Sequence, residues 1–159
     1  MGRKTWESIP PKFRPLKDRI NVNISRSNSD FQIHPAEQGK EAHYDAESLG
    51  ATMAYLTTNT SDKPSIEKIF VIGGGQIYKA ALERKEAKRI LFTRILDDFE
   101  CDTSFPVTLG EDGKGADGWV RRSKEELDAW VGENVPDGEQ VGGEKGTRYV
   151  FEMWEKENE

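Results

Sequence analysis

Residues 69–82 read IFVIGGGQIYKAAL, and they are the strongest local signal in the sequence. Its first four residues are continuously apolar, which is typical of a strand covered on both faces. Three glycines follow, and residues 76–82 then have helical spacing. Glycines let a backbone approach a ligand closely, and a helix N-terminus offers unpaired N–H groups. The stretch matches neither G-x-G-x-x-G nor a P-loop. It therefore predicts a strand–turn–helix that either binds phosphate or is a plain tight turn.

Upstream of this stretch the pattern predicts a helix, a strand and a second helix. Residues 5–9 suit a short helix ended by two prolines, and the Arg14-Pro15 bond is a turn that can be cis. Residues 20–24 alternate apolar and polar, which predicts a strand with one buried face. Residues 27–43 are polar and predict a surface loop. Ser48 is placed to cap a helix through Leu56.

Downstream, residues 90–95 predict another buried strand, and residues 110–118 an acidic loop. Ser123 and Glu126 have the spacing of a capping box, which predicts a short helix through Val131. A loop over residues 132–146 and a final strand over 147–155 follow. Strands interleaved with helices predict an α/β sandwich, with all 159 residues in one domain.

Charge is unevenly distributed along the chain. Residues 1–26 hold seven Lys and Arg against two acidic residues, although the whole chain has a net charge of −6. This basic segment suits a compact anionic ligand better than a nucleic-acid duplex, and a solvated basic face is the other interpretation. No apolar run is long enough for a membrane span. Cys101 is the only cysteine and there are two histidines, so we expect a reducing, cytoplasmic setting and no metal site.

Two further segments have the composition of anion sites. Gly2, Arg3, Lys4 and Thr5 open the first predicted helix. The Ser-Arg-Ser run at residues 25–27 ends the alternating strand and offers hydroxyls and a guanidinium. Each signal is weak alone. Together with the glycine turn they favour a ligand with several phosphates.

Four blocks in this order resemble the dihydrofolate reductase family, in its larger, eukaryotic form. They are MGRKTWESIPPKFRPLKDRINVNISR at 1–26, IFVIGGGQIYKAAL at 69–82, ILFTRILDDFECDTSFP at 90–106 and RYVFEMWEKE at 148–157. The resemblance implies a three-layer α/β sandwich around a mostly parallel mixed sheet. It also implies NADPH-dependent reduction of dihydrofolate to tetrahydrofolate.

The resemblance also implies the roles of individual residues. The cofactor phosphates would be held by Arg3, Lys4 and Thr5, together with the adjacent Gly2. The 2′-phosphate of NADPH would be bound by Ser25 and Arg26, together with the adjacent Ser27. The remaining cofactor contacts would come from Gly73, Gly74, Gly75, Gln76, Ile77 and Tyr78, with a cis peptide between Gly73 and Gly74. The folate side would be formed by Ile9, Phe13, Leu16, Arg19 and Ile72.

Within that folate side, Arg19 would pair with the carboxylate of the glutamate tail, and Ile72 would offer its backbone carbonyl to the pterin. Thr93 would be the catalytic-site hydroxyl that supports the acid. Ordinary core packing is the other interpretation of Ile9, Leu16 and Ile72, and β-propensity that of Thr93. Glu47 falls near a position where members of the family can have a basic residue. We therefore expect this chain to bind the adenosine end of the cofactor more weakly.

Relative to the family, we expect the central N-terminal strand, the mobile loop and the acid-bearing helix to be missing before Met1, and no matched Asp or Glu replaces that acid. Three interpretations stay open. The chain is a reductase with a truncated start, a short paralogue repurposed for binding or non-redox catalysis, or a half completed by an N-terminal piece or by homo-oligomerisation. In the last case an added strand would cover the open sheet edges beside Val71 and Phe92.

Overall fold

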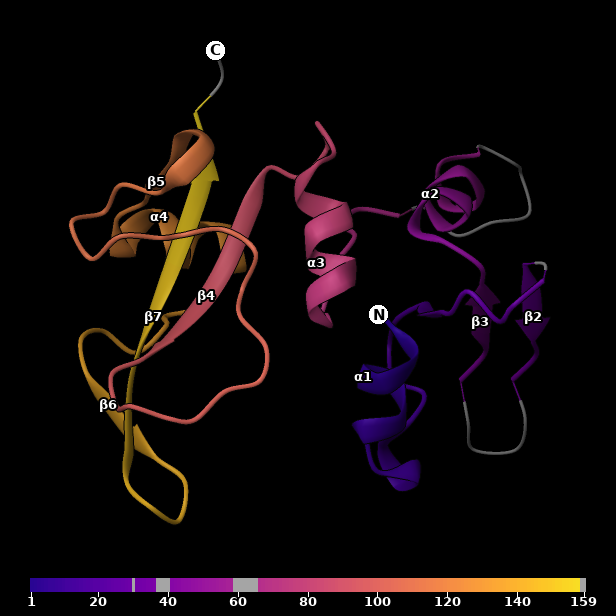
Figure 1. The fold of residues 1–159 in the computed structure, drawn as a ribbon, viewed down its shortest axis with the longest axis horizontal. Helices are drawn as coiled ribbons and strands as arrows, with labels where there is room; N and C mark the ends of the chain where they lie inside the picture. Colours follow the sequence, from indigo (N-terminus) through magenta and orange to yellow (C-terminus); the bar gives the residue numbers. More distant parts are fainter. Residues whose placement is uncertain (30, 37–40, 59–65, 158–159) are drawn as a thin grey trace. The chain divides into compact units, whose positions relative to one another are not determined.

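The computed structural model describes residues 1–29, 31–36, 41–58 and 66–157. The chain divides into two compact units, Met1–Arg84 and Lys85–Glu159. Figure 1 shows the elements of each unit along the chain.

Unit 1 contains a small mixed sheet with helices around it. Its described elements are α1 (Arg3–Ser8), a 3-10 turn (Pro11–Phe13), β1 (Asn21–Ile24), β2 (Gln32–His34), β3 (His43–Ala46), α2 (Leu49–Thr57) and α3 (Gly75–Leu82). β3 lies in the middle, parallel to β1 and antiparallel to β2. Val22, Ile24, Ala46 and Leu49 form the buried core of this unit.

The alternating pattern predicted that β1 has only one buried face. That prediction was wrong. All four residues of β1 are buried, including the two asparagines. Their amides have internal partners: Asn23 Nδ2 donates to Asp45 Oδ1 at 2.9 Å, and Asn21 bonds the loop before the strand. Because a hydrogen-bonded amide is inexpensive to bury, polar residues here do not mark a solvent face.

Several local predictions for unit 1 are confirmed. The Ser48 side chain accepts a hydrogen bond from the Ala51 amide at the start of α2, and the Arg14-Pro15 bond is cis. The surface loop predicted over residues 27–43 is interrupted by β2 and by the start of β3, because Ile33 pairs with Tyr44 in an antiparallel register. That pairing partner is distant in sequence and leaves no periodic signal in so short a strand.

Residues 69–72 do not form the predicted buried strand. They belong to no strand of the described residues, and Ile69 and Ile72 are about two-fifths exposed, at 41% and 39%. A continuously apolar run becomes a strand only where neighbouring strands pair with it. The helix that follows is confirmed as α3.

Unit 2 is an antiparallel sheet with one helix. Its described elements are β4 (Arg89–Ile95), a 3-10 turn (Ala116–Gly118), β5 (Trp119–Arg121), α4 (Lys124–Val131), β6 (Gln140–Gly142) and β7 (Thr147–Lys156). The long strand β7 pairs with β4, β5 and β6. Buried Trp119 and Trp154 are its largest enclosed side chains.

The capping box of α4 is confirmed: Ser123 accepts from the Glu126 amide, and the Glu126 side chain accepts from the Ser123 amide. β4 is a strand as predicted but is not buried throughout, since only Ile90 is enclosed. The loop predicted over residues 132–146 contains β6, because its three residues pair with the start of β7.

The α/β class is confirmed; the sheet of unit 1 is mixed, and the described sheet of unit 2 is antiparallel. The mostly parallel pairing implied by the resemblance is limited, among the described residues, to β1 with β3 and to the Gly2–Ile24 bridge. β7 is long enough to collect three antiparallel neighbours, so antiparallel pairs predominate in unit 2. None of the described helices combines the length and the apolar character that crossing a bilayer requires.

Candidate functional site

Gly2 connects the three segments that the sequence marked as anion sites. Its amide donates to the carbonyl oxygen of Gly73 at 2.7 Å, and it forms a parallel bridge with Ile24, the residue before Ser25. The Ile24 amide in turn donates to the Met1 carbonyl at 2.8 Å. The glycine turn, the start of α1 and the end of β1 therefore lie side by side within unit 1.

The glycines at this junction are sites of close approach. A Cβ added to Gly2 would lie 3.2 Å from the Ile77 side chain, and one added to Gly74 would lie 3.6 Å from Thr5 Oγ1. Gly73 has a φ of +101°, and an added Cβ would meet the Tyr78 ring at 3.3 Å. The peptide between Gly73 and Gly74 is cis, as the resemblance implied. A side chain at Gly73 would be strained at this φ, and one at Gly2 would require the Ile77 side chain to shift.

Ser25 and Ser27 form a small hydroxyl pair after β1. Their Oγ atoms are 2.7 Å apart, and the Ser27 amide donates to Ser25 Oγ at 3.3 Å. The Ser25 amide is fixed by the Ala46 carbonyl at 2.9 Å. Arg26 lies between them with an exposed side chain, so two hydroxyls and a guanidinium face solvent beside the glycine junction.

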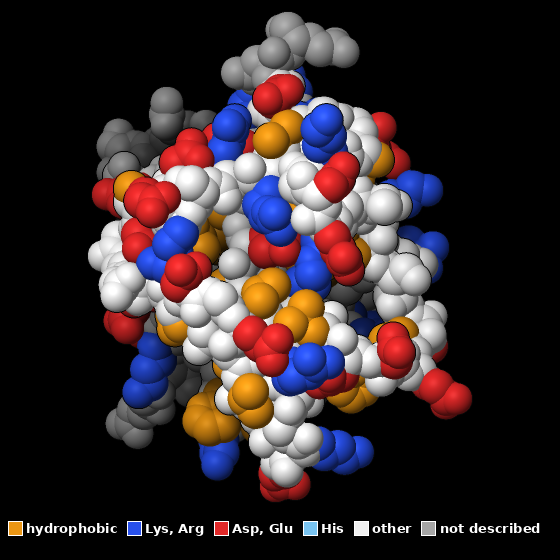
Figure 2. Space-filling view, turned by 90° about the vertical axis from the view of Figure 1, so that its left-hand side faces the viewer, with side chains coloured by type: hydrophobic (Ala, Val, Ile, Leu, Met, Phe, Trp, Pro, Cys, Tyr) orange, Lys and Arg blue, Asp and Glu red, His pale blue; other side chains and the backbone are white. Residues whose placement is uncertain are grey.

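Several basic side chains of residues 1–26 make contacts within this segment. Arg3 pairs with Glu7 at 3.1 Å, Arg14 donates to the Trp6 carbonyl, and Arg19 donates to the Lys17 carbonyl. Lys4 is exposed near the junction. By contrast, the face of the molecule shown in Figure 2 has acidic and basic side chains interspersed, with small hydrophobic groups between them.

Three of the residues assigned to folate line one groove of unit 1. Leu16, Arg19 and Ile72 border a cavity of about 830 Å³. Ile9 is half-buried and Phe13 is 57% exposed, and neither is among the residues that line this cavity. The groove thus brings together only three of the five residues predicted for the folate side.

Asn21 is the residue that sequence analysis missed. It is 2% exposed, and its side chain bonds both the amide and the carbonyl of Leu16, at 2.9 and 2.8 Å, and the carbonyl of Arg19 at 3.0 Å. One amide therefore fixes the loop that presents Leu16 and Arg19. A buried asparagine leaves no signal of its own in an alternating pattern, because its partners are backbone atoms.

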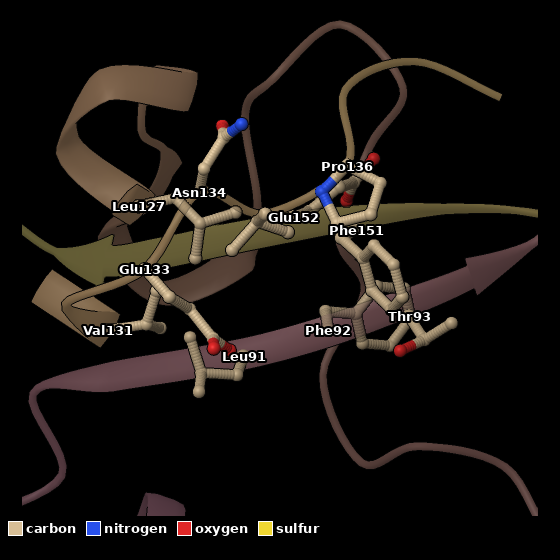
Figure 3. A pocket seen from close by; sticks show the side chains of 11 residues that line it. Leu91, Phe92, Thr93, Leu127, Val131, Glu133, Asn134, Pro136, Phe151 and Glu152 are labelled. Carbon is tan, nitrogen blue, oxygen red and sulfur yellow. The ribbon is translucent and has the colours of Figure 1, made fainter. Parts of the chain in front are cut away.

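Thr93 lies in unit 2, on β4, where it is paired in register with Phe151. It borders a pocket of about 470 Å³ between β4, β7 and the residues that follow α4. Figure 3 shows Thr93 next to the Phe151 ring, with Leu91 and Glu133 on the other side of the pocket.

Glu152, which also lines this pocket, is held by a charged network. Arg94 forms a two-pronged contact with its carboxylate at 2.9 and 3.0 Å, and Arg121 and the Trp154 indole add further bonds. Burial raises the pKa of the Glu152 carboxyl, but its hydrogen bonds from Arg94 and Trp154 outweigh burial and lower the pKa overall. The group is a structural anion, not a proton donor near neutral pH.

Glu47 follows β3 directly and is exposed. Its neighbour Ser48 is engaged as the cap of α2. Among the described residues, no group of three or more His, Cys, Asp or Glu is arranged to hold a metal ion.

Fold and site together define an α/β protein whose first unit brings a glycine turn, the start of α1 and the end of β1 together. The sequence model of dihydrofolate reductase matches residues 1–126. Dihydrofolate reductase from Pneumocystis carinii is 42% identical over 99% of this chain and 72% of its own length. The enzyme from Sus scrofa is 37% identical over 99% of this chain and 73% of its own length. A solved structure of Schistosoma mansoni dihydrofolate reductase superposes with a TM-score of 0.69, at 31% identity, over 98% of this chain and 72% of that one.

The chain belongs to the dihydrofolate reductase family.

Proposed function

We propose that this chain binds NADPH in unit 1 and serves NADPH-dependent reduction of dihydrofolate to tetrahydrofolate. The observation that supports this most is the Gly2–Gly73 hydrogen bond, which brings the three phosphate-type segments to one place. The family match runs through residues of both units, which favours one functional domain over residues 1–159.

The residues present fit the cofactor. Gly2, Gly73 and Gly74 have no side chains that would block a phosphate from the backbone, and a Cβ added to Gly74 would lie 3.6 Å from Thr5 Oγ1. In our proposal Arg3, Lys4 and Thr5 bind the pyrophosphate, while Gly75, Gln76, Ile77 and Tyr78 complete the cradle. When bound, NADPH supplies the hydride.

In this proposal, NADPH is distinguished from NADH by Ser25, Arg26 and Ser27. A 2′-phosphate is a dianion that pairs well with a guanidinium and two hydroxyls, whereas the 2′-hydroxyl of NADH offers neither charge nor multiple acceptors. Exposed Glu47 follows Ala46, whose carbonyl accepts from the Ser25 amide, so its negative charge would oppose that phosphate. We therefore expect a preference for NADPH that is real but moderate.

On the substrate side, Arg19 would bind the glutamate carboxylate, Leu16, Ile9 and Phe13 would contact the aminobenzoyl ring, and the Ile72 carbonyl would accept from the pterin. Thr93 would support protonation from unit 2. None of these groups is itself an acid able to donate a proton near neutral pH. For that reason we propose that residues 1–159 alone reduce dihydrofolate slowly.

Isothermal titration of the purified chain with NADPH and NADH tests the cofactor assignment. We expect NADPH to bind at least about tenfold more tightly, and Arg26→Ala to remove most of that difference, a change of about 1.4 kcal/mol. Lys17→Ala is the matched control, since it deletes an exposed cation of the same basic segment. Equal affinity for the two dinucleotides contradicts the assignment. So does an equal loss of the preference for NADPH in Arg26→Ala and Lys17→Ala.

The turnover assay is separate. With NADPH bound, we expect dihydrofolate reduction well below ordinary enzyme rates of about 10 per second. Tight NADPH binding with no reduction of dihydrofolate under any condition would favour a paralogue without reductase activity. The lone, exposed Cys101 suits a reducing compartment, and we place the protein in the cytoplasm on that ground.

A further inference from the structure

The turn that follows β1 carries an arginine whose position depends on the backbone alone. In this turn, residues 25–28, the Asn28 amide donates to the Ser25 carbonyl at 3.0 Å. Arg26 is the second residue of the turn, and its side chain is exposed. It makes no hydrogen bond or ion pair with any residue that the structure describes. The backbone of the turn therefore determines where the guanidinium lies.

One side chain ties this turn to the body of unit 1. Asn28 Nδ2 donates to the Ala46 carbonyl at 3.1 Å. The other bonds described for residues 26–28 stay within the turn, since the Ser27 amide and hydroxyl both contact Ser25 Oγ and the Asn28 amide bonds the Ser25 carbonyl. Among the described residues, the Asn28 side chain thus makes the one hydrogen bond that joins residues 26–28 to the rest of the unit.

The group that accepts this bond is well fixed. Ala46 ends β3, is fully buried and is paired in parallel register with Ile24. Its carbonyl oxygen also accepts from the Ser25 amide at 2.9 Å, and the two lone pairs of a carbonyl oxygen allow both bonds. One buried oxygen atom therefore fixes both ends of the turn, through a backbone donor at Ser25 and a side-chain donor at Asn28.

We propose that Asn28 is a positioning residue for the 2′-phosphate of NADPH. Its side chain keeps the turn in place, so that the Arg26 guanidinium is in position before the dinucleotide binds. A segment that is already ordered loses less entropy on binding, which raises the affinity. Because NADH has no 2′-phosphate for the guanidinium to bind, this gain applies to NADPH alone. The inference rests on the proposed function and adds to it a residue that acts through Arg26.

The test is isothermal titration of the whole chain with NADPH and with NADH, in a double-mutant cycle of Asn28→Ala and Arg26→Ala. We expect Asn28→Ala to weaken NADPH binding about fivefold, while NADH binding stays within about twofold of the unchanged chain. In the Arg26→Ala background, Asn28→Ala should change NADPH binding by less than about twofold, because the guanidinium that it positions is already absent.

Thr57→Ala is the matched control. Thr57 Oγ1 also donates to a backbone carbonyl of unit 1, that of Met53 at 2.7 Å, but in α2 and outside the turn. Its loss should leave the affinity for both dinucleotides within about twofold. Asn28 is not among the residues that line the groove of unit 1, so Asn28→Ala should leave folate binding within the same range.

Amide hydrogen exchange tests the structural part without any ligand. In Asn28→Ala the amides of residues 25–28 should exchange at least about fivefold faster than in the unchanged chain, because the turn opens more easily.

Three results would overturn this inference and leave the proposed function intact. These are unchanged exchange in residues 25–28, an equal loss of NADPH and NADH affinity in Asn28→Ala, and a loss that persists in full in the Arg26→Ala background. An unchanged chain that binds NADPH and NADH equally would overturn both the inference and the proposed function, and so is distinguished from the other three results.

Discussion

The amide of Gly2 lies 2.7 Å from the carbonyl oxygen of Gly73, so the first residues of the chain and the glycine turn form one structure. Because Ile24 is bridged to the same Gly2, a change at this one position reaches all three anion-type segments.

Gly2→Val should therefore weaken NADPH binding. An added Cβ would lie 3.2 Å from Ile77 Cγ1, and the larger side chain would push α3 away from the junction. Overpacking of this kind costs about 1–3 kcal/mol, and we expect NADPH affinity to fall at least about tenfold. Titration calorimetry measures the affinity, and circular dichroism monitors folding. NADPH affinity unchanged in a folded variant would show that the junction is not where the dinucleotide binds.

Gly50→Ala should stabilise the protein without changing cofactor affinity. Gly50 is exposed on α2, and an added Cβ would meet only Ser48 Oγ, at an ordinary 3.7 Å. Alanine restricts the unfolded chain and has the higher helix propensity, which together contribute about 0.5–1 kcal/mol. Urea unfolding followed by circular dichroism would detect this gain. It also serves as the glycine control for Gly2→Val, and a loss of stability would show that α2 is crowded there.

Asn21→Ala should loosen the loop that presents Leu16 and Arg19. The side-chain amide makes three bonds to that loop, and removing it leaves partly buried backbone groups without these partners, at a cost of about 1–3 kcal/mol. We expect a lower urea midpoint and weaker binding of folate, with NADPH affinity much less affected.

Asn28→Ala is the matched control for that change, because Asn28 is half-buried in the same unit and its side chain makes one described bond, to the Ala46 carbonyl. Equal losses in the two variants would mean that Asn21 contributes only to general packing of unit 1. Asn21→Asp would retain the acceptor toward the Leu16 amide but lose both donated bonds, so its stability should also fall.

Local chemistry explains how far the sequence could predict this structure. The capping box at Ser123 and Glu126, the Ser48 cap and the glycine turn depend on neighbours within a few residues, and each was predictable. β2 and β6 were not, since each has three residues, too few for a periodic signal, and is defined by its pairing, β2 with β3 and β6 with the start of β7. For residues 69–72 the sequence indicates a buried strand, but strand geometry requires partners that this stretch lacks among the described residues.

The residues of the site were also predictable only in part. Gly2, Ser25 and Gly73 could be proposed from composition and resemblance, and their proximity follows from backbone bonds that only the fold reveals. Asn21 could not be proposed, because its role consists of contacts to main-chain atoms of Leu16 and Arg19.

Glu152→Gln should destabilise the protein near neutral pH and flatten its response to acid. Burial raises the pKa of Glu152, but hydrogen bonds from Arg94 and Trp154 lower it by more than burial raises it. The folded-state pKa therefore lies below the unfolded value of about 4.3. Its contribution to stability is therefore present above about pH 4.3 and is lost as the pH falls through the lower, folded-state value. Removing the charge leaves Arg94, which is 18% exposed, beside Arg121 without its carboxylate, at a cost of roughly 2–3 kcal/mol.

Urea unfolding at a series of pH values between about 2 and 7 would measure this effect, with Asp97→Asn as the control. Asp97 also has a pKa lowered by hydrogen bonds from Arg148, but its side chain is 33% exposed, against 5% for Glu152, so its loss should leave the unfolding midpoint closer to that of the unchanged chain. We expect the difference between wild type and Glu152→Gln to shrink as the solution is acidified below the ordinary carboxyl range. A difference that stays constant down to pH 2 would show that Glu152 stabilises unit 2 by shape and packing and not by its charge.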